Sequence, residues 1–158
     1  MSLIVQKYGG TSVGSSEKIK AVAERVLKYS RKGHQVVVVL SAMSGETDRL
    51  ISLANSMQEQ PDSREMDVLL STGEQVTISL FAMAIKSSGF DAISFLGDQV
   101  KIQTSNLHTK ARIQSVDTDK VKKHLDEGKI VVIAGFQGVD ETGDITTLGR
   151  GGSDTTAV

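Results

Sequence analysis

Two almost wholly apolar runs constrain the fold more than any other feature of the sequence. They are "QVVVVLS" at 35–41 and "KIVVIAGF" at 129–136, and both are rich in β-branched residues. Strands that are buried on both faces of a parallel sheet have this composition. Segments with helical spacing of apolar residues lie between such runs, and this alternation is typical of βαβ units.

The same patterns predict the remaining elements. We expect strands at 3–8, 35–41, 91–97 and 129–136, with shorter, partly exposed strands within 98–116 and a hairpin at 139–148. Helices are expected at 15–33, 47–58, 62–72, 74–87 and 118–128, two of them meeting at Gly73. The predicted fold class is α/β, as a three-layer α/β/α sandwich with a mostly parallel central sheet.

Composition narrows the possible functions. The chain has 158 residues, which corresponds to one domain or a large part of one. It has no cysteine, which fits a reducing cytoplasm, and its net charge of −1 comes without a basic cluster, so we expect no nucleic-acid partner. Its apolar runs are short against the roughly 20 residues that span a bilayer, so we expect no membrane partner.

Three loops at the predicted carboxyl ends of the strands are rich in glycine and hydroxyl groups. They cover 7–14, 41–48 and 135–154. Ligands of open α/β sheets bind beyond the carboxyl ends of the strands, so these loops are the expected site. The alternative for "KYGGTSVG" at 7–14 is a tight turn with a solvated lysine, since this segment matches neither common nucleotide-binding motif.

Four blocks of sequence, in order, resemble the aspartokinases of the amino-acid kinase superfamily. They are "VQKYGGTSV" near the start, "VVVLSAMSGETDRL" at 37–50, "LLSTGEQVTISL" at 69–80 and "VIAGFQGVDETGDITTLGRGGSDTTA" at 132–157. The resemblance covers essentially the whole chain. It implies a carbamate kinase-like fold, here truncated. Residues 1–158 would form the amino-acid-binding part of the catalytic domain, without the nucleotide-binding half and the regulatory ACT domains.

The resemblance implies ATP-dependent phosphorylation of the side-chain carboxylate of L-aspartate to 4-phospho-L-aspartate, with Mg²⁺ accompanying ATP. This reaction is the first step toward lysine, threonine, methionine and isoleucine. A carboxylate with a reference pKa of about 3.9 is ionised at pH 7 and needs no general base. We therefore interpret His34, His108 and His124 as solvated or structural, and we name no metal ligands.

The resemblance also implies roles for individual residues. Lys7 and Asp154 would be catalytic, with Lys7 neutralising charge on the phosphoryl group and Asp154 orienting Lys7. The aspartate-binding residues would be Thr47, Glu74, Arg150, Gly151, Gly152 and Ser153. The residues at the phosphates of ATP would be Lys7, Tyr8, Gly9, Gly10, Ser41 and Ser153. Structural alternatives are an N-cap at Thr47 and an ordinary first-turn glutamate at Glu74.

Other functions stay open at this point. The chain could be a non-catalytic aspartate-binding or assembly fragment, or another amino-acid kinase of the same superfamily. As partners we expect L-aspartate and ATP, together with further copies of the chain, as a homo-oligomer or a self-associating fragment.

Overall fold

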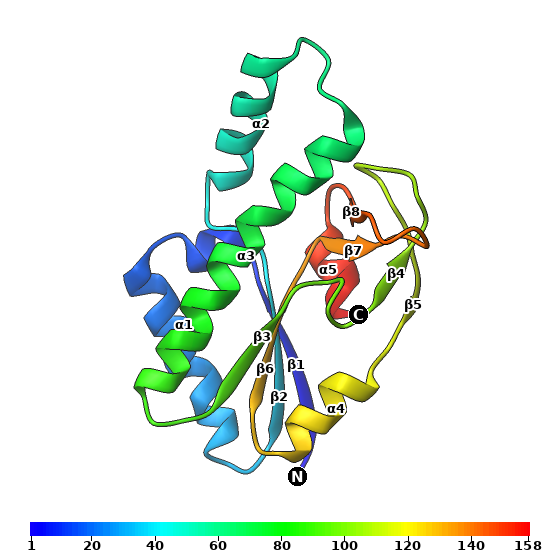
Figure 1. The fold of residues 1–158 in the computed structure, drawn as a ribbon. Coiled ribbons are helices and arrows are strands. Elements are labelled where there is room, and N and C mark those ends of the chain that lie inside the picture. The colour runs from blue at the N-terminus through cyan, green and yellow to red at the C-terminus, as the bar shows by residue number, and fades with distance from the viewer.

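A four-stranded parallel sheet forms the centre of the molecule (Figure 1). The computed structural model describes residues 1–158. The strand order is β1-β2-β6-β3, and its members are β1 (Leu3–Tyr8), β2 (Gln35–Leu40), β6 (Ile130–Ala134) and β3 (Ala92–Phe95). All three pairings are parallel, which confirms the predicted central sheet.

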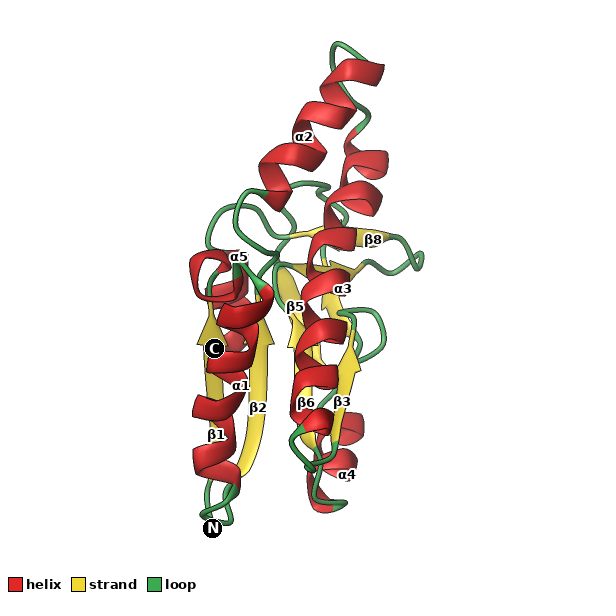
Figure 2. Ribbon diagram, turned by 90° about the vertical axis from the view of Figure 1, so that its left-hand side faces the viewer, coloured by secondary structure: helices red, strands yellow, loops and turns green.

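Helices cover both faces of this sheet (Figures 1 and 2). Helices α1 (Ser16–Ser30) and α3 (Ser63–Ser87) pack on one face, where the strands contribute side chains such as Val38 and Val132 to a shared core. Helix α4 (Asp119–Asp126) and α5 (Gly152–Ala157) lie on the other face, against side chains such as Val39. The three-layer sandwich is therefore confirmed, and the alternation of neighbouring valines between two cores explains why β2 is apolar throughout.

A second, smaller sheet lies beyond the carboxyl ends of the first (Figure 1). Its strand order is β5-β4-β7-β8, with bounds β5 (Ile113–Val116), β4 (Ile102–Thr104), β7 (Gln137–Val139) and β8 (Ile145–Thr147). Strands β7 and β8 are antiparallel and form the predicted hairpin. The sequence patterns predicted these strands but not that they would join in one sheet.

Helix α2 (Glu46–Met57) and the first half of α3 project together beyond the central sheet (Figure 2). The prediction of two helices that meet at Gly73 is wrong, because α3 is one helix of 25 residues. Gly73 is buried against the loop after β2, and a Cβ atom there would lie 2.9 Å from the Cβ of Ala42. The glycine is required by this close packing and does not end the helix.

The beginning of α2 also differs from one prediction. Gly45 precedes the helix with a φ of 80°, in the left-handed region, and Thr47 is the second helical residue. No side chain caps this end, so the interpretation of Thr47 as an N-cap is wrong. Thr47 is thereby left free to line the site described below.

Helix α3 is the one helix with the length and apolar composition to cross a membrane. Its most apolar window has a mean hydropathy of 1.5, and half of that window is buried inside the protein. A buried helix in a protein core passes the same test, and the packing of α3 against both α1 and the central sheet accounts for its composition.

Candidate active site

The three glycine-rich loops meet at one pocket at the carboxyl edge of the central sheet, as predicted. Its volume is about 330 Å³. The lining residues of these loops and of α2, α3 and α5 are Lys7, Gly10, Ser41, Ala42, Met43, Ser44, Gly45, Thr47, Asp48, Glu74, Phe136, Gly149, Arg150, Gly151, Gly152, Ser153 and Asp154. Ten of the twelve residues that the sequence singled out thus line one pocket.

An ion pair joins the first and last elements of the chain at this pocket. Lys7 Nζ, near the end of β1, lies 3.0 Å from Asp154 Oδ1 in α5. The side chain of Asp154 is 71% exposed, so the pair contributes little to stability. Its effect is to hold the lysine ammonium over the loop, where a Cβ atom at Gly9 would lie 3.5 Å from Nζ.

Hydrogen bonds and close packing fix the loops against each other. Ser41 Oγ donates to Ser153 Oγ over 2.9 Å, which connects the end of β2 to α5. The amide of Ser44 donates to the Gly10 carbonyl over 3.1 Å. A Cβ atom at Gly10 would lie 2.8 Å from the Ala42 carbonyl oxygen, so only glycine permits this approach.

Several backbone amides around the pocket have no acceptor within the chain. The N–H groups of Gly9, Gly10, Gly151 and Ser153 donate to no backbone or side-chain atom. Free amides beside an ammonium group form a favourable environment for an anion with several oxygens. Gly9 does not line the pocket itself, but it lies between two residues that do.

Glu74 is a buried carboxylate in the wall of the pocket. It lies in the middle of α3, so the interpretation as a first-turn glutamate is wrong, and its exposed fraction is 2%. Burial raises the pKa of Glu74 to about 8, and hydrogen bonds from its own amide, Gln137 and the Ala42 amide offset only part of this effect. Such a carboxyl group is poised to ionise when a cation binds beside it.

Arg150 and the glycines that flank it also line the pocket. Gly149 and Gly151 have φ values of 82° and 78°, which brings the backbone through a tight double turn. The arginine side chain is exposed and forms no ion pair within the chain. Its guanidinium group is therefore available to a ligand, whereas the Lys7 ammonium is already shared with Asp154.

Tyr8 does not line the pocket, and its side chain points away from it, so its expected contact with the phosphates of ATP stays a prediction. Side chains alternate along a strand, so Lys7 and Tyr8 point to opposite faces of β1. The Tyr8 hydroxyl donates to Gln6 Oε1 over 3.0 Å, and its ring packs against the core beneath α1.

The sequence patterns did not single out Gln137, which bonds Glu74, or seven lining residues, which are Ala42, Met43, Ser44, Gly45, Asp48, Phe136 and Gly149. Gln137 is 2% exposed and donates from Nε2 to Glu74 Oε2 over 3.3 Å and to the Ser71 carbonyl over 3.1 Å. Phe136 lines the pocket with a φ of 73°, which is unusual for a bulky residue. A polar residue directly after a fully buried strand was the available signal for Gln137.

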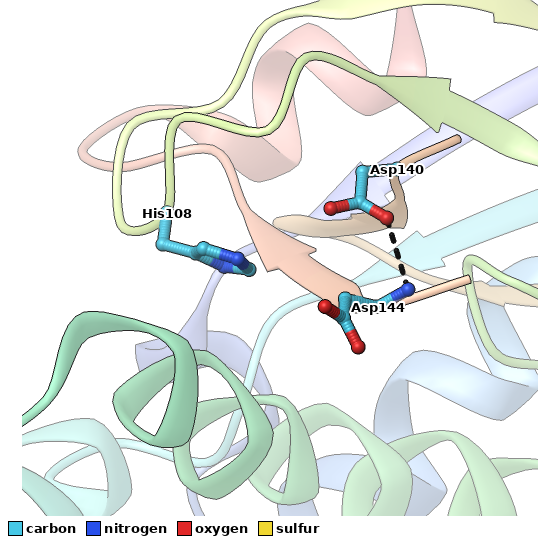
Figure 3. A group of neighbouring side chains, drawn as sticks. All are labelled: His108, Asp140 and Asp144. Carbon is cyan, nitrogen blue, oxygen red and sulfur yellow. Dashed lines mark hydrogen bonds between the residues drawn. The ribbon is translucent and has the colours of Figure 1, made fainter. Parts of the chain in front are cut away.

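A second polar cluster lies apart from the pocket, beside the β7–β8 hairpin. The His108 ring points toward the carboxylates of Asp140 and Asp144 (Figure 3), and the three potential ligand atoms lie within 4.8 Å of one another. Donors of the chain already occupy these carboxylates. Arg64 donates to Asp144 over 2.8 Å and lowers the pKa of that carboxyl group, while the Asp144 amide donates to Asp140 over 3.0 Å.

Comparisons with known proteins agree with the fold and the pocket. Residues 2–158 match the model of the amino acid kinase family. An aspartate kinase of Pseudomonas putida is 61% identical over 158 residues, which are the whole chain and 38% of that protein.

Solved structures of aspartate kinases are also similar to the chain. The chain is similar to aspartate kinase from Synechocystis (TM-score 0.84, 49% identity, 98% of this chain and 25% of that one). It is also similar to E. coli aspartokinase III, crystallised with lysine and aspartate (TM-score 0.85, 26% identity, 97% of this chain and 45% of that one). The chain thus spans well under half the length of these relatives, and it belongs to the amino acid kinase family.

Proposed function

We propose that this chain forms the amino-acid-binding part of an aspartokinase, which transfers the γ-phosphoryl group of ATP to the side-chain carboxylate of L-aspartate. One observation carries the proposal: a single pocket is lined by an ammonium group and free amides, and also by a buried carboxylate and an unpaired guanidinium. An amino acid has the complementary charges. The relatives that match the chain are themselves aspartate kinases.

Glu74 and Arg150 are the groups that would hold the backbone of the amino acid. The Glu74 carboxylate is the partner for the α-ammonium group, because a bound cation offsets the burial that now favours its neutral form. Arg150 is the partner for the α-carboxylate, which a guanidinium can bind through two parallel hydrogen bonds. Thr47 adds a hydroxyl group to the lining of the same pocket.

Lys7 and the glycine loops would hold the phosphoryl group. Phosphoryl transfer depends mainly on positioning and on neutralising charge, and Lys7, Ser41 and Ser153 supply an ammonium and two hydroxyls. The free amides of Gly9 and Gly10 add further donors. Asp154 keeps Lys7 in place through their ion pair. The attacking carboxylate is already ionised, so no side chain needs to accept a proton.

Mg²⁺ would arrive on the phosphates of ATP as part of the substrate, because this ion is usually held by phosphate oxygens with few protein ligands. Contacts to the rest of the nucleotide belong to parts of the enzyme outside this chain, which spans 38% of the Pseudomonas putida relative. We also propose a cytoplasmic location, with which a cysteine-free chain is compatible. E. coli aspartokinase III, which was crystallised with lysine and aspartate, supports the choice of substrate.

The decisive experiment measures ADP release by the full-length enzyme with L-aspartate, L-glutamate or no acceptor. We expect release that depends on L-aspartate, with formation of an acyl phosphate that hydroxylamine traps. Turnover with another amino acid in place of aspartate would assign the chain to a different kinase of the family. Saturable aspartate binding without ADP release would favour a non-catalytic role.

A further inference from the structure

We propose that Asp67 is a positioning residue that aligns Arg150 with Glu74 across the pocket. The inference rests on the proposed function, since it concerns how the two ionic contacts to the amino acid are held at a fixed separation. Asp67 does not line the pocket and takes no part in the reaction itself. It acts through the segments that carry the arginine.

Asp67 is a fully buried carboxylate on which three segments converge. Its exposed fraction is 0%, and it accepts a hydrogen bond from Thr147 Oγ1 over 2.6 Å. The Thr109 amide donates to both of its oxygens over 3.1 Å, and His108 Nδ1 lies 2.7 Å from Oδ2. A buried carboxylate with this many donors joins α3, the 105–110 loop and β8 into one unit.

The groups bound by Asp67 lie directly against the loop that carries Arg150. Thr147 ends β8, and Gly149 follows it after one residue. Thr109 is held at a φ of 69°, and a Cβ atom at Gly149 would lie 3.1 Å from its carbonyl oxygen. The Thr109 backbone thus forms the support on which the left-handed turn at Gly149 is placed. Backbone hydrogen bonds also hold this segment, since the Ala111 amide donates to the Thr147 carbonyl and the Leu148 amide to the Phe136 carbonyl. Asp67 adds the side-chain link between Thr147 and the Thr109 backbone.

Helix α3 also carries the other ionic contact. Asp67 and Glu74 are seven residues apart, which places them two turns apart on the same face of a helix. The same rigid element therefore holds the Glu74 carboxylate in the pocket and, through Asp67, fixes the start of the Arg150 loop. The separation between the two contacts is then set by the helix rather than by flexible loops.

The first test replaces Asp67 by asparagine in the full-length enzyme. One amide oxygen cannot accept from three donors, and its NH₂ group would face another donor. We expect the KM for aspartate to rise about tenfold, with kcat and the KM for ATP nearly unchanged, because Arg150 binds a part of the substrate that does not react. A fall in kcat at unchanged KM would overturn the proposal.

A double-mutant cycle separates positioning from general loss of stability. If Asp67 acts through Arg150, then Asp67→Asn should have little further effect on the KM for aspartate in an Arg150→Ala background. Additive effects of the two substitutions would show that Asp67 acts elsewhere. This comparison stays valid even when both single variants are less stable than the wild type.

Two neighbouring threonines provide a matched pair of variants. Thr147→Val removes a hydroxyl that bonds Asp67, whereas Thr146→Val removes an equally buried hydroxyl that bonds Thr104 over 2.6 Å. Both should lower stability, but only Thr147→Val should raise the KM for aspartate. This pair also tests the proposal should Asp67→Asn fail to fold.

Hydrogen exchange gives a readout that does not depend on activity. In Asp67→Asn and Thr147→Val the amides of residues 148–153 should exchange faster than in the wild type, and in Thr146→Val they should not. Equal exchange in all variants would overturn the inference. Absence of aspartate-dependent turnover in the wild type would instead refute the proposed function, and the exchange data would still decide the role of Asp67.

Discussion

We expect Glu74 to make amino-acid binding depend on pH. Its pKa is raised to about 8 by burial, so the carboxyl group is mainly neutral at pH 7 and must lose a proton when an ammonium group binds. We expect aspartate to bind the full-length enzyme more tightly as the pH rises from 6 to 8, with proton release on binding. Calorimetry in two buffers of different ionisation enthalpy measures this release. Glu74→Gln should abolish it, and equal proton release in both proteins would contradict the assignment.

The same carboxyl group predicts a stability profile for the chain. A pKa that rises from 4.5 in the unfolded chain to about 8 in the folded one means that the folded state binds more protons between these values. The contribution of Glu74 to the free energy of unfolding should therefore be fully present below pH 4.5. It should decrease as the pH rises from 4.5 to 8, by up to about 5 kcal/mol in total. Urea unfolding of the wild type and Glu74→Gln checks this, because the variant should lack this part of the decline.

Lys7 should affect the rate more than binding. Replacement by alanine removes a preorganised cation from the transferring phosphoryl group, which typically costs about 3–4 kcal/mol, or roughly 10²–10³-fold in kcat. The KM for aspartate should change little. Lys28→Ala, an exposed lysine of α1, is the control. Steady-state kinetics with an unchanged kcat and a raised KM would refute the role of Lys7.

Sequence motifs predicted the residues that face the pocket better than those that support it. Lys7, Glu74, Arg150 and Asp154 stand in blocks that resemble a family, and the structure brings them together. The partners of Asp67 and Gln137 could not be predicted, because they lie about 40 to 80 residues away in the chain. The residues next to Asp67 and Gln137 in the sequence are those of an ordinary helix and an ordinary strand.

The interior of α3 provides a test of tertiary packing against local propensity. Alanine is favoured over glycine in a helix by about 1 kcal/mol, so propensity alone predicts that Gly73→Ala stabilises the protein. The added Cβ would lie 2.9 Å from the Cβ of Ala42, so we expect a lower melting temperature instead, together with weaker aspartate binding. Thermal unfolding measures the effect, with Gln75→Ala at an exposed position of α3 as the control. A rise in melting temperature for Gly73→Ala would show that the loop after β2 moves to accommodate the added methyl group.

Periodicity predicted the central strands and the longer helices, but it gave no signal for the 3-10 turn at Gly10–Val13 or for the six-residue helix α5. It also divided α3 in two, and this error has a physical cause. A glycine within an apolar pattern signals either a break or a close contact, and the two cannot be distinguished without knowing what lies opposite. At Gly73 the opposite element is the loop after β2, more than thirty residues earlier in the chain. The joining of four short strands in a second sheet was unpredictable for the same reason.

An uncharged stripe on the outer side of α3 predicts self-association. Val76, Leu80 and Met83 are 47%, 39% and 63% exposed, and their spacing places them on one side of the helix. We expect two copies to pair through this side, so that sedimentation velocity gives a dimer at high concentration. Met83→Glu should restore the monomer, whereas Met57→Glu, at the distant end of α2, should not. A wild-type monomer at all concentrations would refute this interface.

The 158-residue chain alone should bind aspartate weakly and release no ADP. It contains the charged groups that we assign to the amino acid, but spans only 38% of the Pseudomonas putida relative. Charge-assisted hydrogen bonds contribute about 1.5–3 kcal/mol each, so two of them give at best millimolar affinity after the cost of ordering. Calorimetric titration and a coupled ADP assay measure both. Robust turnover would show that the contacts outside this chain are dispensable.

Because Lys7 pairs with Asp154, the pocket cannot be completed during synthesis until the later of these two residues has been made. The lysine is synthesised 147 residues before its partner. At roughly 5–20 residues per second, several seconds to about half a minute separate their appearance. Strand β3 likewise waits for β6, which is made later and is its only partner in the sheet. During that interval the nascent chain carries a finished β1–β2 pair, an exposed sheet edge and half a binding site. We expect a chaperone to bind the chain in this period, because the exposed edge is then available for aggregation.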